Sequence, residues 1–149
     1  MHSNRTLPFR PKNCDGAWRR LRLRSTRQLP AAIKAVTAAM AARDFTEKDL
    51  WSMCLALEEA LVNAFKHGNQ LDPAKRVRLR FCVDARRALV QVLDEGAGFA
   101  RDAVADPLDP ENLERACGRG LLLMRSFMTW IRHNERGNLV TLCKRRSVR

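Results

Sequence analysis

The segment from Thr46 to Gly68 constrains the fold most, because it predicts one long helix with a single apolar side. Thr46 is a favourable N-cap, and Asp49 follows three residues later, close to the pattern of a capping box. The apolar positions recur at helical spacing: Leu50, Cys54, Leu57 and Leu61. We expect this side to pack against a β-sheet, and Gly68 to end the helix.

The strands of that sheet are expected before and after the helix, where apolar and polar residues alternate. They are residues 18–24, residues 76–84 and 88–96 around a short turn, and a hairpin over residues 130–145. Further helices are expected over residues 31–43, with Pro30 in the first turn, and from Gly120 onwards. This order of elements predicts an α+β fold, a two-layer α/β sandwich with a mixed, mainly antiparallel sheet and helices on one face.

The sequence is strongly basic, with 28 Lys and Arg against 16 Asp and Glu and a net charge of +12. The surplus lies at the two ends, whereas residues 28–143 hold sixteen basic and fifteen acidic residues. We expect basic tails over residues 1–16 and 145–149, around one domain over residues 17–144. Aromatic residues do not interleave with the basic ones, and no recognition-helix or zinc-finger motif occurs. No direct nucleic-acid partner is therefore expected, and an acidic protein is the alternative partner for the basic ends.

The five cysteines are widely spaced, odd in number and without a C-x-x-C pair: Cys14, Cys54, Cys82, Cys117 and Cys143. We interpret them as small, buried, reduced residues. No apolar run approaches the roughly 18 residues of a membrane span, and the first residues form no apolar signal segment. A cytoplasmic protein with no membrane partner is expected.

The long helix also carries a polar stripe close to its end. Glu59 and Asn63 lie about 40° apart around the helix axis, and Lys66 falls beside them. A carboxylate and an amide on one stripe can serve a reaction, although any helix exposed to water has a polar side.

Two glycine-containing segments follow the helix. A strand ends in Asp94, and Gly96 and Gly98 would allow a flat ligand or a phosphate to approach the backbone closely. The second segment opens a helix with Gly118, Arg119 and Gly120. The free N–H groups of a helix start attract anions, and an arginine there can reach a phosphate oxygen.

The order of these three segments resembles the nucleotide-binding fold of the GHKL superfamily, which includes DNA gyrase and the histidine kinases. The stretches EEALVNAFKHGN, VLDEGAGF and GRGLLLMRSFM are most similar to the anti-sigma-factor serine kinases of bacterial partner-switching systems. The resemblance spans roughly residues 18–144, which is nearly the whole chain apart from its ends.

The resemblance implies ATP and Mg²⁺ as cofactors and a role for each matching residue. It makes Asn63 the Mg²⁺ ligand and Glu59, rather than the neighbouring Glu58, the general base. It makes Asp94 the partner of the adenine amino group. It makes Gly96 and Gly98 shape the adenine side of the pocket, and residues 99–117 a lid over the phosphates. The segment after the lid holds phosphate, with Gly118, Arg119 and Gly120.

The resemblance further implies a protein serine/threonine kinase that phosphorylates a serine on a STAS-domain anti-anti-sigma protein. Many such kinases also sequester a sigma factor, and many are homodimers. Two other functions stay open: a nucleotide-sensing module that binds a regulator with little turnover, and the ATP-binding domain of a histidine kinase. Only about 17 residues precede the first strand, too few for a dimerisation helix pair that carries a phosphoacceptor histidine.

Overall fold

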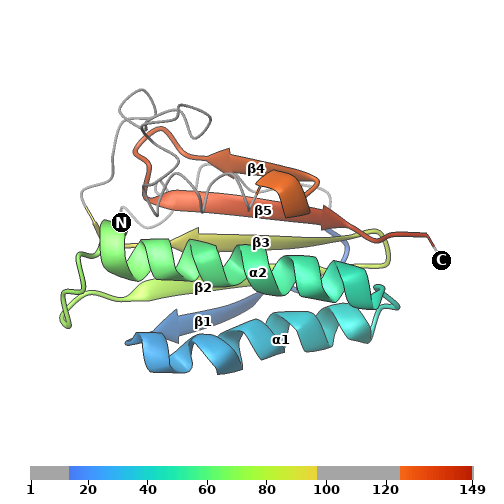
Figure 1. Cartoon of the computed structure of the whole chain (residues 1–149), viewed down its shortest axis with the longest axis horizontal. Helices are drawn as coiled ribbons and strands as arrows, with labels where there is room; N and C mark the ends of the chain where they lie inside the picture. Colours follow the sequence, from blue (N-terminus) through green and yellow to red (C-terminus); the bar gives the residue numbers. More distant parts are fainter. Residues whose placement is uncertain (1–13, 97–124, 149) are drawn as a thin grey trace.

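The computed structural model describes residues 14–96 and 125–148. In this part of the chain five strands form one antiparallel sheet, and the helices cover one of its faces (Figure 1). The strand order is β1-β2-β3-β5-β4, and each of the four pairings is antiparallel. This confirms the α+β sandwich predicted from the sequence, with a sheet that is antiparallel rather than mixed in this part. None of the described helices has the length and apolar content needed to cross a membrane.

The strands lie close to the segments expected from alternation. Their bounds are Arg19–Leu23 for β1, Val77–Val83 for β2, Arg87–Leu93 for β3, Trp130–His133 for β4 and Leu139–Arg145 for β5. The turn between β4 and β5 closes on Asn134, whose Oδ1 accepts hydrogen bonds from the backbone N–H of Gly137 at 2.8 Å and of Asn138 at 3.1 Å. Gly137 has a φ of 80°, a left-handed conformation that glycine adopts readily. Residues close to each other in the sequence therefore set this turn.

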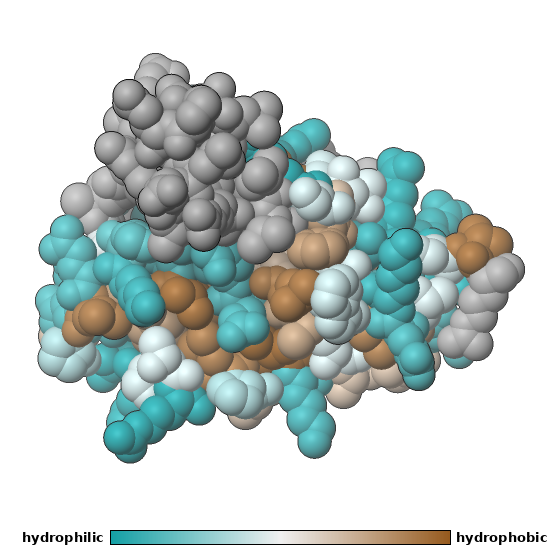
Figure 2. Space-filling model, in the orientation of Figure 1, coloured by the Kyte–Doolittle hydropathy of each residue, from teal (hydrophilic) through white to brown (hydrophobic). Residues whose placement is uncertain are grey.

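Two helices, α1 at Leu29–Ala41 and α2 at Glu47–Asn63, form the second layer. A 3₁₀ turn, η1 at Thr26–Gln28, precedes α1, and a π-helical turn, η2 at Ala64–Gly68, follows α2. The core between the layers contains side chains from both that are fully buried, among them Val36, Met40, Met53, Leu57, Leu61, Leu79 and Phe81. Figure 2, in the same orientation, shows that apolar surface also remains between polar side chains on the helix-covered face.

The start of α2 has the capping box that the sequence predicts. The backbone N–H of Asp49 donates to Thr46 Oγ1 at 3.1 Å, and the backbone N–H of Thr46 donates to Asp49 Oδ2 at 3.3 Å. The Asp49 carboxylate also accepts hydrogen bonds from the backbone N–H of Ser147 at 2.8 Å and from its hydroxyl at 2.6 Å. Burial raises the pKa of Asp49, but these hydrogen bonds outweigh it and hold the pKa below its ordinary value. The residues after β5 are thus attached to the start of α2.

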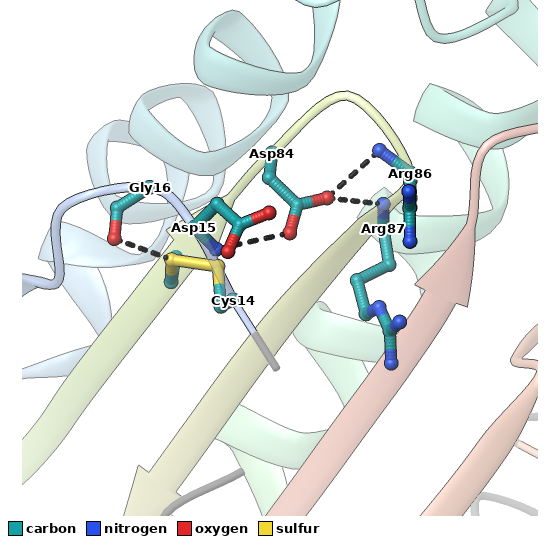
Figure 3. The surroundings of a disulfide bond; sticks show 7 residues. Cys14, Asp15, Gly16, Asp84, Arg86 and Arg87 are labelled. Atoms are coloured by element: carbon teal, nitrogen blue, oxygen red, sulfur yellow. Dashed lines mark hydrogen bonds between the residues drawn. A yellow bond between two sulfur atoms is a disulfide. The ribbon is translucent and has the colours of Figure 1, made fainter. Parts of the chain in front are cut away.

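The interpretation of all cysteines as reduced residues is wrong for Cys14 and Cys82, which form a disulfide (Figure 3). Cys54 and Cys143 are free, and Cys117 lies outside the described residues. The two bonded residues are 68 positions apart, so nothing in the local sequence indicates their pairing. Strand β1 lies beside β2 with Arg19 opposite Phe81, and the residues just before β1 therefore reach Cys82.

Further contacts hold the chain around this disulfide. The backbone N–H of Asp15 donates to Asp84 Oδ2 at 3.2 Å, and Asp84 Oδ1 accepts from the backbone N–H groups of Arg86 and Arg87 (Figure 3). A Cβ atom at Gly16 would lie well under 3.0 Å from the Val83 carbonyl oxygen, a separation that real Cβ atoms do not tolerate. Residues 14–16, which the sequence suggested to be part of a tail, therefore pack closely on the end of β2.

Candidate active site

The polar stripe expected on the long helix is present at the end of α2. Glu59 and Asn63 are both half-buried, and Asn63 is the last residue of α2. Their neighbours Ala60 and Leu61 are buried in the core, so the stripe runs along the border between the core and the surface. Lys66, which was expected beside them, is exposed.

Glu59 has the electrostatic surroundings of a proton acceptor. Burial raises the pKa of its carboxyl group, and the negative charge of Glu58 raises it further. The nearby His67 and Lys66 act in the opposite direction without cancelling the rise. A carboxylate with a raised pKa binds a proton more readily at neutral pH, as general-base catalysis requires. Glu58 itself is exposed, as expected for a residue on a different side of the helix.

The helix changes its hydrogen bonding directly after Asn63. In η2 the backbone N–H of Asn69 donates to the carbonyl oxygen of Ala64 at 2.8 Å, a π-helical bond across five residues. The prediction of a continuous α-helix to His67 is therefore wrong for its last turn. Short π-helical turns within helices often accompany functional sites, since they alter the direction of nearby side chains and backbone.

Gly68 is the last residue of η2, so the helical segment ends where the sequence predicts, and the glycine has a second role that was not predicted. Its φ is not in the left-handed region, whereas Gln70 and Leu71 have positive φ values of 52° and 57°. A Cβ atom at Gly68 would lie less than 3.0 Å from all three terminal atoms of the Asp94 carboxyl group. A Cβ atom at Gly96 would lie far inside the same limit from the Gly68 carbonyl oxygen. The two glycines therefore allow the end of the helix to touch the chain that follows β3.

Asp94, immediately after β3, lies within this contact. Its backbone N–H donates to the carbonyl oxygen of Asn138 at 3.0 Å, and its Oδ1 accepts from the backbone N–H of Gly96 at 2.8 Å. Burial raises the pKa of Asp94 to about 6, against smaller opposing effects of the Gly96 N–H and of the charges on Arg136 and Lys75. No described residue donates a hydrogen bond to Oδ2 of this carboxylate. The backbone therefore fixes one oxygen of the Asp94 carboxylate.

Asn69 is a residue of this site that the sequence interpretation missed. It is buried, with a relative exposure of 1%, and its side chain connects two segments. Oδ1 accepts from the backbone N–H of Glu95 at 2.7 Å, and Nδ2 donates to the carbonyl oxygen of Arg76 at 3.0 Å. Asn69 thus holds the turn after Asp94 against the end of η2. The available signal was a polar residue directly after the helix-ending glycine, which is too common to interpret alone.

The described residues suit an adenine nucleotide with a magnesium ion. A carboxylate oxygen beside closely packed glycine backbone can accept a hydrogen bond from the amino group of a flat base. The amide oxygen of Asn63 is a hard ligand, and Mg²⁺ commonly takes only one or two ligands from protein and others from phosphate. Within the described ranges no group of three or more His, Cys, Asp or Glu could hold a metal. Four of the expected site residues lie outside these ranges: Gly98, Gly118, Arg119 and Gly120.

Comparison with known proteins agrees with this geometry. A family model described as the histidine kinase-like ATPase domain matches residues 23–144, a range that includes Glu59, Asn63 and Asp94. The serine-protein kinase RsbW of Bacillus subtilis (strain 168) is 30% identical over 120 residues, which cover 75% of each chain. The match therefore extends over most of the domain and is not confined to the site.

Proposed function

Because the chain belongs to the family of histidine kinase-like ATPase domains, we propose that it is an ATP-dependent protein serine/threonine kinase of the anti-sigma-factor type. One observation carries the proposal: the Asp94 carboxylate, enclosed between Gly68 and Gly96, lies where the helix that bears Glu59 and Asn63 ends. Family membership implies ATP binding, and the similarity to a serine-protein kinase supports serine as the phosphate acceptor.

Different described residues serve nucleotide binding and proton transfer. Asp94 accepts a hydrogen bond from the amino group of adenine through Oδ2, while the Gly96 N–H holds Oδ1. Asn63 offers its amide oxygen to Mg²⁺. When bound, magnesium and ATP supply an activated phosphoryl group. Glu59 accepts the proton of the serine hydroxyl, and its raised pKa lets it keep that proton.

We further propose that the serine belongs to a STAS-domain anti-anti-sigma protein, and that a sigma factor is a second, competing partner. The similarity to RsbW supports this assignment. Two surfaces of the same chain that bind alternative partners would make the kinase a switch.

Thermal unfolding with and without Mg·ATP tests the nucleotide site. ATP at about 100 times its Kd should stabilise the wild type by about 2.7 kcal/mol and raise the midpoint by about 5–10 °C. Asp94→Asn replaces the accepting oxygen pair with an amide and should abolish the shift. The exposed Asp72→Asn removes the same charge outside the site and should keep it. A wild type without any shift would refute the nucleotide site.

Phosphotransfer to a STAS-domain protein tests the base. Glu59→Gln should lose transfer of labelled phosphate while it keeps the thermal shift with Mg·ATP, because the amide cannot accept the proton. Glu58→Gln is the matched control and should retain transfer. Equal loss in both variants would assign no special role to Glu59. ATP binding without transfer in the wild type would favour a nucleotide-sensing module over a kinase.

A further inference from the structure

Charge is divided unevenly between the two layers of the fold. The described strands hold nine Lys and Arg, three in β1, two in β2, one each in β3 and β4 and two in β5, and no Asp or Glu. Helix α2 alone holds four acidic residues. The sheet is therefore the basic layer of the molecule.

Most of these basic side chains lie on the sheet face that the helices do not cover. In each strand, alternate residues belong to the core under the helices, for example Leu79 and Phe81 in β2. The residues between them therefore lie on the opposite face. Seven arginines occupy such positions, and we call them the arginine face: Arg20, Arg22, Arg78, Arg80, Arg87, Arg132 and Arg145.

The arginine face places like charges directly opposite each other. Arg20 is paired with Arg80 and Arg22 with Arg78, on neighbouring strands. Like charges at directly opposite positions destabilise a sheet unless other groups compensate them. Arg80 is buried and has interactions of its own, so we consider only the other three arginines. Among the residues that the structure describes, no carboxylate forms an ion pair with Arg20, Arg22 or Arg78, and all three side chains are exposed. Protection of an edge strand against aggregation explains charge on β1, but it does not explain charge on the interior strand β2.

We propose that the arginine face and the outer edge of β1 bind an extended acidic segment of a partner protein. Strand β1 is first in the sheet order, and no other described strand pairs with its outer edge. A segment that adds there as a new strand gains backbone hydrogen bonds and places alternate side chains beside Arg20 and Arg22. Carboxylates two residues apart in such a strand have the same spacing as these two arginines, about 7 Å. Arginine forks bind carboxylates through two parallel hydrogen bonds.

The surroundings of the added strand's other face predict which further side chains the acidic segment should carry. Its remaining side chains would lie beside Leu21, which is partly buried and packs on the core near α1. Apolar residues fit that position, so the expected segment alternates acidic and apolar residues. This inference does not depend on the proposed kinase activity, because the arginine face and α2 lie on opposite faces of the sheet.

Two other occupants fit the observations less well. A single-stranded nucleic acid needs aromatic rings with open faces for its bases. The half-buried Trp18 already has the Arg80 guanidinium 4.5 Å from its ring centroid, and Trp130 has Arg132 at 4.9 Å. A second copy of the chain, paired through β1 in antiparallel fashion, would bring arginines of both copies together.

Fluorescence anisotropy with a labelled ten-residue peptide of alternating Glu and Val tests the proposal. We expect binding that weakens at high salt and falls at least tenfold in Arg20→Glu/Arg22→Glu. Lys34→Glu/Arg43→Glu makes the same charge change at exposed positions in and after α1 and should bind within twofold of the wild type. Far-UV circular dichroism checks that both variants are folded. Absence of binding to the wild type, or equal loss in both variants, would overturn the proposal.

Three further measurements separate strand addition from the alternatives. A peptide N-methylated at alternate residues keeps its charge but loses backbone donors, and it should bind at least tenfold more weakly. Unchanged affinity of this peptide would overturn the strand-addition part. Tighter binding of a 12-nucleotide uracil RNA than of the peptide would favour nucleic acid instead. A mass by light scattering that changes between the wild type and Arg20→Glu/Arg22→Glu would identify a second copy as the occupant.

Discussion

The contact between Gly68 and Asp94 predicts that Gly68→Ala destabilises the protein when Asp94 is present and stabilises it when Asp94 is replaced by alanine. In the wild type, Gly68→Ala places a Cβ atom against the Asp94 carboxyl group, which must rotate away. The rotation costs about 0.5–1.5 kcal/mol as an unfavourable rotamer. It also removes the hydrogen bond from the Gly96 N–H, worth about 1.5–3 kcal/mol for a charged acceptor.

Alanine also has a favourable effect at this position. Gly68 has no left-handed φ, so alanine fits the backbone and should gain about 0.5–1 kcal/mol over glycine in a helical turn. The net expectation is a destabilisation by about 1–4 kcal/mol in the wild type. In the Asp94→Ala background the carboxyl group is absent, and Gly68→Ala should then stabilise by about 0.5–1 kcal/mol.

Urea unfolding of the four proteins in this double-mutant cycle, followed by tryptophan fluorescence, measures the coupling free energy. Gly96→Ala is the matched control, because the nearest atoms to its Cβ are backbone atoms of Gly68, which Asp94→Ala leaves in place. It should destabilise in both backgrounds. If Gly68→Ala is equally destabilising with and without Asp94, the reasoning about this contact is refuted.

Three further predictions concern stability. The pKa of Asp94 rises from 3.8 to about 6 on folding, so the native state keeps a proton that the unfolded chain has released, and stability should fall as the pH rises from about 4 to 6. Because the Asp94 side chain is partly exposed, the expected loss of unfolding free energy is reduced to about 1–2 kcal/mol. Urea titrations at a series of pH values measure this loss, and Asp94→Asn should remove it. Reduction of the Cys14–Cys82 disulfide, or Cys14→Ser, should cost about 2–5 kcal/mol, and an unchanged urea midpoint would contradict its role. Asn69→Ala leaves the Glu95 N–H without its acceptor and should lower the thermal midpoint and weaken ATP binding, which calorimetry can measure in parallel.

The features that the sequence predicted well depend on residues close together in the chain. The capping box of Thr46 and Asp49 spans three residues, and the β4–β5 turn spans five, so their residue types determine them directly. The strands follow from alternation within single segments. The stripe of Glu59 and Asn63 likewise needs only the helical repeat.

The features that the sequence did not reveal depend on distant pairs. Gly68 looked like a helix-ending residue, yet its small size is required by Asp94, 26 positions away. The disulfide joins residues 68 positions apart. The arginine face was not evident from the charge counts, because a count along the chain cannot show which layer of the fold holds each charge. In each case the missing information was the register between strands or between a strand and a helix.

The attachment of Ser147 to Asp49 has a consequence for synthesis of the protein. The buried Asp49 carboxylate accepts two hydrogen bonds from a residue 98 positions later in the chain. At about 5–20 residues per second, a ribosome needs roughly 5–20 s to make that residue after Asp49 has been added. During this interval the Asp49 carboxylate has only the hydrogen bond of its own capping box. The start of the helix that bears Glu59 and Asn63 therefore gains these two hydrogen bonds only after the residues that follow β5 have been made.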